Sequence, residues 1–212
     1  MTAPSPKYQA LVWGGLGLVV VIITLAFVKT SLVGKPLPVY GSVPSFHLTN
    51  QLEQPVTEQT FRGHPWVCDV IFSTCPSQCL RMSELMSQIQ KALPNDTSVR
   101  LVSLTAYPEF DGPQVLKKYG DRFGADANKW LFLTGTKSDI NHLAASGLKF
   151  VVAEKKPSER DSENDLFIHT TKFVLLDKAG RIRGWYNSED SGSLKTILAA
   201  LKNLSDEAPI SP

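Results

Sequence analysis

The chain has 212 residues, with 22 Lys and Arg against 20 Asp and Glu, which gives a formal net charge of +2. This balance lacks the basic surplus or stripe that a nucleic-acid-binding protein needs, and a hydrophobic content of 42% excludes a wholly disordered chain. The length suits one domain with an appendage, and three cysteines are too few for a disulfide scaffold.

The first predicted element is a membrane anchor within residues 1–29. Residues 8–28, YQALVWGGLGLVVVIITLAFV, carry no ionisable group beyond the Tyr8 phenol, and about 20 apolar residues in a helix span a bilayer. Tyr8 and Trp13 lie near one end, where amphipathic rings favour the membrane interface. A cleaved secretory signal is the alternative, but its apolar region is usually shorter and a small-x-small site should follow it. We therefore predict an uncleaved single-pass helix, whose orientation the flanking charges do not determine.

The soluble part starts with a predicted linker over residues 30–45, which holds three prolines and two glycines. From residue 46 the pattern indicates one globular domain that extends to residue 204, and the polar tail over 205–212 is expected to be flexible. Apolar runs and helical spacing of apolar residues predict strands over 67–72, 99–104, 130–133, 149–152, 173–176 and 181–186. They also predict helices that begin at residues 76, 113 and 194, and one that Ser138 caps. The charged segment 153–165 predicts a mobile loop. This order predicts an α/β fold with a mixed central sheet flanked by helices.

The chemically informative motif is the segment 73–79, which reads Ser-Thr-Cys-Pro-Ser-Gln-Cys. Cys75 is expected at the end of a strand and Cys79 in the first turn of the next helix, where the amides and dipole of the helix N-terminus lower a thiol pKa. Four-residue spacing places Cys79 about one turn along, on the same face. The pair can form a disulfide, or in reduced form it can hold one soft metal ion. Two inert buried cysteines are the alternative, but these belong in apolar surroundings, and this junction holds proline and polar residues.

The third cysteine, Cys68, lies inside an apolar strand and is predicted to fill the core. Among the four histidines, His169 stands out because it follows the charged loop and opens an apolar strand, a position typical of functional side chains. This position alone does not make His169 a ligand, because most histidines are not ligands. The others lie in an extended segment, a turn and a helix, and are predicted to be solvated or locally hydrogen-bonded: His47, His64 and His142.

Several segments together resemble the SCO1/SenC family. The stretch that begins at Pro44, PSFHLTNQLEQPVTEQTFRGHPWVCDVIFSTC, is similar to the opening of a thioredoxin-like domain. The further segments that carry the resemblance are the Cys-x-x-x-Cys motif, Val102-Ser103-Leu104-Thr105, Pro108 with Asp111 and Pro113, and residues 169–177, HTTKFVLLD. The resemblance extends over about residues 40–203. It implies a thioredoxin-like fold that follows an N-terminal transmembrane helix in the chain.

Members of this family are membrane-anchored copper proteins that assist assembly of the binuclear copper centre of cytochrome c oxidase. The resemblance implies that Cys75, Cys79 and His169 ligate copper, as Cu(I) and also as Cu(II). Two thiolates and an imidazole independently suit Cu(I), because soft sulfur ligands select it, whereas a structural zinc site normally takes four ligands. The implied partners are the oxidase copper subunit or another copper acceptor, and a thiol–disulfide reductant. The implied location is the bacterial cytoplasmic membrane, with the soluble domain on the periplasmic side.

Three positions depart from the family pattern. Many members have proline where Leu80 stands, an acid of an Asp-Pro-x-x-Asp stretch where Tyr107 stands, and an acid before the histidine where Ile168 stands. These departures bear on oxidase-assembly specificity more than on copper binding.

The competing function is that of a thiol–disulfide oxidoreductase with Cys75 and Cys79 as the redox pair. One thiolate would attack a partner's disulfide and the other would resolve the mixed disulfide. Such enzymes usually have a proline that faces the cysteines just before the hairpin strand, where this chain has Thr170. A redox sensor would use the same dithiol. The sequence thus favours a metallochaperone over an enzyme and leaves both alternatives open.

Overall fold

The computed structural model describes residues 13–24, 36–160 and 166–207, without the side chains of Pro157, Ile168 and His169. The chain divides into two compact units, Met1–Pro36 and Leu37–Pro212. In the first unit, residues 13–24 form a helix. Throughout the described residues, no helix combines the length and apolarity needed to cross a membrane. The predicted anchor over residues 8–28 extends beyond the described helix at both ends and stays a prediction.

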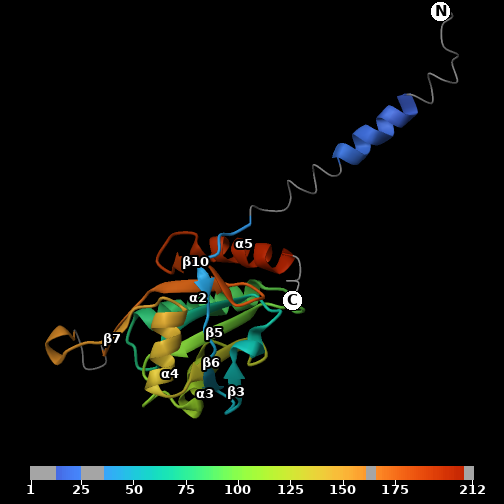
Figure 1. The fold of residues 1–212 in the computed structure, drawn as a ribbon. Helices are drawn as coiled ribbons and strands as arrows, with labels where there is room; N and C mark the ends of the chain where they lie inside the picture. Colours follow the sequence, from blue (N-terminus) through green and yellow to red (C-terminus); the bar gives the residue numbers. More distant parts are fainter. Residues whose placement is uncertain (1–12, 25–35, 161–165, 208–212) are drawn as a thin grey trace, which may run out of the picture. The chain divides into compact units, whose positions relative to one another are not determined.

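The second unit is built on a mixed eight-stranded sheet with the order β1-β10-β9-β4-β5-β6-β2-β3 (Figure 1). Its strands are β1 (Gly41–Ser42), β2 (His47–Asn50), β3 (Pro55–Thr57), β4 (Trp66–Ile71), β5 (Arg100–Thr105), β6 (Trp130–Thr134), β9 (Lys172–Leu176) and β10 (Arg181–Asn187). The central strands β4, β5 and β6 are parallel, whereas β9 pairs with β4 in the antiparallel sense. All six residues of β4 are buried, as a continuous apolar run predicts for a strand covered on both faces.

Two helices cross over between the parallel strands. Helix α2 (Gln78–Ala92) connects β4 to β5, and α3 (Pro113–Arg122) connects β5 to β6. Both connections move in the same direction across the sheet, so right-handed crossovers place both helices on one face. Helix α5 (Ser193–Asp206) packs against α2 and runs beside β10 (Figure 1). The helix predicted from residue 76 begins at residue 78 instead, with Ser77 as its N-cap.

The return from β6 to β9 is more structured than the sequence predicted. It contains α4 (Lys137–Asn141), the π-helix η2 (His142–Gly147), the hairpin of β7 (Val152–Glu154) and β8 (Phe167–His169), and the 3-10 helix η3 (Pro157–Glu159). The hairpin is a separate two-stranded sheet that extends from the body of the domain (Figure 1). The segment 153–165, expected to be loop throughout, therefore includes most of β7 and all of η3. The strand predicted over 149–152 is displaced, since only Val152 belongs to β7, and its pairing partner β8 lies beyond the charged run.

The N-terminal strands were not predicted as strands, although His47 was placed in an extended segment. Strand β1 lies inside the segment 30–45, which was expected to be linker, and pairs with β10. Strand β2 pairs with β3 and with β6. The 3-10 helix η1 (Glu58–Phe61) follows β3 and contributes Phe61, whose ring stacks on Trp66 with 4.7 Å between centroids. In the described sheet, β1 forms one edge and β3 forms the other.

Candidate metal centre

The two motif cysteines converge at the start of α2. Cys75 lies in the loop that follows β4, and its N–H donates to the carbonyl of Phe72 across 3.1 Å. Cys79 lies in the first turn of α2, and its N–H donates to the Cys75 sulfur across 3.4 Å. Neither cysteine is in a disulfide. The predicted convergence of the two residues is therefore present in the structure.

The two sulfurs differ in their access to solvent. Cys75 keeps 8% of its surface exposed and Cys79 keeps none. Burial raises the pKa of the Cys79 thiol far above its ordinary value, and the hydrogen bond with Cys75 acts in the same direction. The expectation that the helix N-terminus lowers the pKa is wrong for Cys79, because loss of hydration outweighs the helix amides. In the metal-free protein Cys79 is therefore a neutral thiol at physiological pH.

A buried polar group lies beneath the cysteines. Asp69, on β4, is fully buried, and its carboxylate is among the charges that raise the pKa of Cys79 and of Tyr119. The Tyr119 hydroxyl lies 2.9 Å from the Ser83 hydroxyl and donates to the Cys79 carbonyl across 3.4 Å. Sequence patterns did not identify Ser83 or Tyr119, since each resembles an ordinary helical core position. A buried acid inside an apolar strand was the available signal for Asp69.

A second buried carboxylate holds the Cys75 loop. Asp111 lies between β5 and α3, and accepts hydrogen bonds from the Ser73 N–H at 3.0 Å, from the Ser73 hydroxyl and from the Thr105 hydroxyl at 2.6 Å. Burial raises the pKa of Asp111, although these hydrogen bonds oppose the shift. The sequence marked Asp111 only through the family resemblance. Its role as an acceptor for the loop follows from the tertiary structure.

The third predicted ligand, His169, was expected to open an apolar strand, but it ends strand β8, where its backbone pairs with Val152, and the next strand begins at Lys172. Its side chain lies outside the described part of the structure. Among the described side chains, no group of three His, Cys, Asp or Glu residues has the arrangement of a metal site. The chemistry of the donor set fits copper, since the Cys75 and Cys79 sulfurs are soft ligands at one helix N-terminus. The complete ligand set of Cys75, Cys79 and His169 stays a prediction.

The remaining cysteine and histidines have local roles. Cys68 is fully buried in β4, on the strand that was predicted for it. The Nδ1 of His64 lies 2.9 Å from the Ser98 carbonyl, so this nitrogen carries the proton and donates it. His47 in β2 and His142 at the start of η2 are exposed. These positions agree with the structural roles expected for them.

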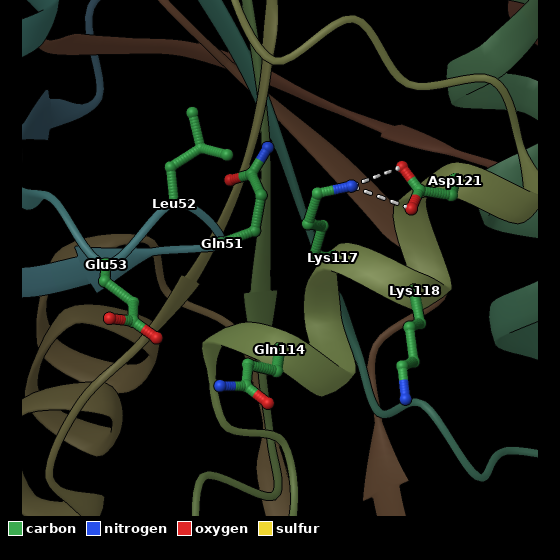
Figure 2. Close-up of a pocket in the computed structure, with 7 residues that line it drawn as sticks. All are labelled: Gln51, Leu52, Glu53, Gln114, Lys117, Lys118 and Asp121. Carbon is green, nitrogen blue, oxygen red and sulfur yellow. Dashed lines mark hydrogen bonds and ion pairs between the residues drawn. The ribbon is translucent and has the colours of Figure 1, made fainter.

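A surface hollow on another part of the domain has no connection with the cysteines. It has a volume of about 470 Å³ and is lined by Gln51, Leu52, Glu53, Gln114, Lys117, Lys118 and Asp121 (Figure 2). Lys117 and Asp121 form an ion pair at 2.9 Å across one turn of α3, so their charges compensate each other. The lining offers neither sulfur nor imidazole, and therefore no soft ligand for copper.

Comparison with known proteins identifies the family. A model of SCO1/SenC matches residues 38–206. The chain belongs to the SCO1/SenC family. The family resemblance found in the sequence is thereby confirmed. The SCO1 protein homolog of Bacillus subtilis strain 168 is 31% identical over 170 residues, which cover 79% of this chain and 85% of that protein.

Solved Sco structures share the fold. BsSco, described as a member of the Sco family of cytochrome c oxidase assembly proteins with a disulfide switch, is 29% identical, with a TM-score of 0.68 and coverage of 82% of this chain and 98% of its own. Copper-bound ScoI of Bradyrhizobium japonicum has a TM-score of 0.66 at 21% identity, with 77% of this chain and 99% of that one covered, and shows the fold alone. The mixed α/β, thioredoxin-like architecture predicted from the sequence is thus the architecture of Sco proteins.

Proposed function

We propose that this SCO1/SenC protein binds one copper ion through Cys75, Cys79 and His169 and passes it to an acceptor during assembly of cytochrome c oxidase. The proposal depends chiefly on one observation, the 3.4 Å approach of the Cys79 N–H to the Cys75 sulfur, which brings two soft donors together at one helix N-terminus. Two thiolates with an imidazole suit Cu(I), and Cu(II) is a second state that such a site accepts.

The unequal burial of the two thiols gives each a different part in loading. Cys75 is the one with exposed surface, so an incoming Cu(I) ion or donor protein reaches it first. Cys79 is neutral before binding, because burial raises its pKa. Its proton must leave when the sulfur becomes a ligand, so loading releases a proton. Transfer onward requires the reverse exchange, which a site with few protein ligands permits.

The proposed setting is the bacterial cytoplasmic membrane. The apolar segment 8–28 supports a single-pass anchor because of its length and its interfacial aromatic residues. We place the soluble domain on the periplasmic side by analogy with the family. Fusions of alkaline phosphatase and of a cytoplasmic reporter after residue 212 would test the orientation, since phosphatase activity requires a periplasmic C-terminus and reporter activity at that site would reverse the assignment.

A Cu(I) titration of the reduced full chain, in competition with a chromophoric chelator, tests the ligand set. We expect one tight equivalent, with affinity reduced in Cys75→Ser, Cys79→Ser and His169→Ala by more than the roughly 10- to 100-fold that loss of an outer-shell partner costs. Cys68→Ser is the matched control, because Cys68 is buried on the strand before the loop. Equal losses in the control and in Cys75→Ser would overturn the ligand assignment.

The same preparation separates the chaperone from a thiol–disulfide reductase. Reduced protein is mixed with a disulfide substrate, and the thiols that remain are counted before and after copper loading. A reduced chain that binds no copper but rapidly reduces the substrate would replace the proposed function with the reductase. A chaperone is expected to hold copper, to lose two free thiols from the count on loading and to reduce the substrate slowly.

A further inference from the structure

The short loop between β5 and α3, residues 106–112, touches both segments that carry the proposed ligands. One of these segments is the loop after β4, which holds Cys75. The other is strand β8, which ends at His169. These segments lie far apart in the sequence, so something in the fold has to hold them at a defined separation. The contacts of Asp111 and Tyr107 meet this requirement.

Asp111 fixes the cysteine side. Its carboxylate is fully buried and accepts from the backbone N–H and the hydroxyl of Ser73, two residues before Cys75. The Thr105 hydroxyl, at the end of β5, occupies the same carboxylate oxygen as the Ser73 N–H. Three donors to one carboxylate tie the loop that carries Cys75 to the end of the neighbouring central strand, because charge-assisted hydrogen bonds are the strong ones.

Tyr107 fixes the histidine side. Its ring lies 5.4 Å, between centroids, from the ring of Phe167, which is 6% exposed and belongs to the same three-residue strand as His169. Phe167 also meets Phe72 edge-on, with 5.3 Å between ring centroids. Tilted and edge-on aromatic pairs of this kind stabilise a contact beyond the area that they bury. The ring of Tyr107 therefore holds the backbone of β8 against the domain.

The two contacts share one tight turn. The Asp111 N–H donates to the Tyr107 carbonyl across 2.8 Å, and the Tyr107 N–H donates to the Thr105 hydroxyl across 2.9 Å. On the outer side, Lys137 forms ion pairs with Glu109 of the same loop at 3.6 Å and with Glu154 of β7 at 2.6 Å. The loop, the end of β5 and the hairpin are thus joined by contacts on two sides.

We propose that Asp111 and Tyr107 are the positioning residues of the copper site, Asp111 for the loop that carries Cys75 and Tyr107 for the strand that carries His169. This inference rests on the proposed function. It also gives a role to one departure from the family pattern. Many members have an acidic residue at the position of Tyr107, and in this chain the tyrosine ring contacts Phe167 instead. Neither residue contacts copper in this proposal, so each acts through the segment that it holds.

A double-mutant cycle in the reduced full chain tests whether Tyr107 acts through His169 and Asp111 acts independently of it. Tyr107→Ala is expected to weaken Cu(I) binding about tenfold, the scale of an outer-shell loss, while Tyr107→Phe retains the ring and restores the affinity. In a His169→Ala background, Tyr107→Ala should add nothing, because the segment it positions no longer supplies a ligand. Asp111→Asn should still weaken binding in that background. Phe110→Ala is the matched control, since Phe110 stacks on Tyr107 from the exposed side and does not meet Phe167.

A readout without copper tests Asp111 separately. We expect Asp111→Asn to raise the alkylation rate of Cys75 in the metal-free protein severalfold, because one acceptor oxygen is replaced by an amide that cannot accept from the Ser73 N–H. Tyr107→Ala should leave this rate unchanged. Ser73→Ala removes only the hydroxyl donor to Asp111, so a smaller increase in the alkylation rate of Cys75 is expected. This variant can be measured if Asp111→Asn does not fold.

The outcomes distinguish this inference from the proposed function. If wild-type protein takes up no copper that depends on Cys75 and Cys79, the proposed function fails and the assignment of ligand-positioning residues fails with it. If copper binding holds but Tyr107→Ala costs the same with and without His169, Tyr107 is structural and its assignment is overturned. An alkylation rate of Cys75 that is unchanged in both Asp111→Asn and Ser73→Ala overturns the assignment of Asp111.

Discussion

Arg183 and Asp177 form a buried ion pair, with the guanidinium Nη1 2.9 Å from the carboxylate Oδ2. Arg183 on β10 also binds both carboxylate oxygens of Glu207 at 2.6 Å and donates to the carbonyl of Leu37 at 2.6 Å. One side chain therefore joins the first residue of the second unit, the β9–β10 turn and the residue after α5. This network therefore links the first residue of the second unit to the end of its last helix.

Removal of the Arg183 charge is expected to destabilise the domain strongly. Arg183→Met should lower the free energy of unfolding by an amount toward the lower end of about 3–5 kcal/mol, because the buried Asp177 carboxylate keeps only the partly exposed Arg181 as an ion-pair partner. Urea denaturation of the full chain, followed by tryptophan fluorescence, measures the change. The control is Lys202→Met, which removes an exposed ion pair to Asp206 and should cost less than about 0.5 kcal/mol. Similar losses in both variants would show that burial of the pair is unimportant.

The free energy of unfolding at acidic pH should depend on two carboxyl groups, Asp177 and Asp111, whose pKa values shift in opposite directions. Burial alone would raise the pKa of Asp177, but hydrogen bonds from Arg181, Ala179 and Arg183 outweigh it and lower the pKa. Its contribution is therefore present above the unfolded pKa of about 3.9 and is lost as the pH falls through the lower, folded pKa. The stability difference between wild type and Asp177→Asn should shrink as the pH falls below about 4.

Asp111 should show the reverse slope. Burial raises its pKa, so the folded state favours the protonated carboxyl. Its contribution is fully present below the unfolded pKa of about 3.9 and declines as the pH rises through the folded value. The stability difference between wild type and Asp111→Asn should therefore grow as the pH is lowered toward about 4. Urea titrations at a series of pH values test both slopes, and parallel slopes for the two variants would contradict the opposite shifts.

Local patterns were enough to predict the central part of the fold. The apolar runs that predicted β4, β5 and β6 and the helical spacing that predicted α3 and α5 reflect burial on adjacent residues, which sequence displays directly. Strand β1 was not predicted, and the strand predicted over 149–152 shares only Val152 with β7, because each is defined by pairing with a strand more than twelve residues away. Non-local pairing leaves little periodic signal in a two- or three-residue strand.

The sequence predicted which residues form the candidate site but not the surroundings of each. The spacing of Cys75 and Cys79 predicted their convergence at a helix start, and the structure shows it. The raised pKa of Cys79 was not predictable, because it comes from burial by distant elements. The contact of Tyr107 with Phe167 likewise joins residues that only the fold brings together. Chemical identity was thus visible in the sequence, whereas the environment of each group was not.

The three thiols should react with iodoacetamide in the order of their exposure. Cys75 is expected to react first in native, reduced, metal-free protein, whereas Cys68 and Cys79 are fully buried and burial raises the pKa of both. Since the thiolate is the nucleophile and each unit of pKa lowers its population about tenfold, both buried thiols should be slower by at least about tenfold. A time course at pH 8, read by mass spectrometry of the digested chain, gives the three rates. Equal rates for Cys75 and Cys79 would contradict the burial.

The hydroxyl pair beneath Cys79 should be energetically coupled. Ser83 on α2 and Tyr119 on α3 lie 2.9 Å apart in the core, and the Tyr119 hydroxyl also reaches the Cys79 carbonyl. Ser83→Ala or Tyr119→Phe alone should each cost about 1–3 kcal/mol, because a single removal leaves a buried polar group with one partner fewer. The double variant should cost less than the sum, with a coupling of about 0.5–3 kcal/mol.

Urea unfolding of the two single variants and the double variant measures this coupling. Ser205→Ala is the matched control, because its hydroxyl donates to the Leu201 carbonyl within α5 and links no second element. Its effect should stay within about 0.5 kcal/mol, as for other substitutions away from buried networks. Strict additivity of Ser83→Ala and Tyr119→Phe would mean that the two hydroxyls do not depend on each other. Coupling would instead identify the pair as the contact that holds α3 against the turn of α2 in which Cys79 lies.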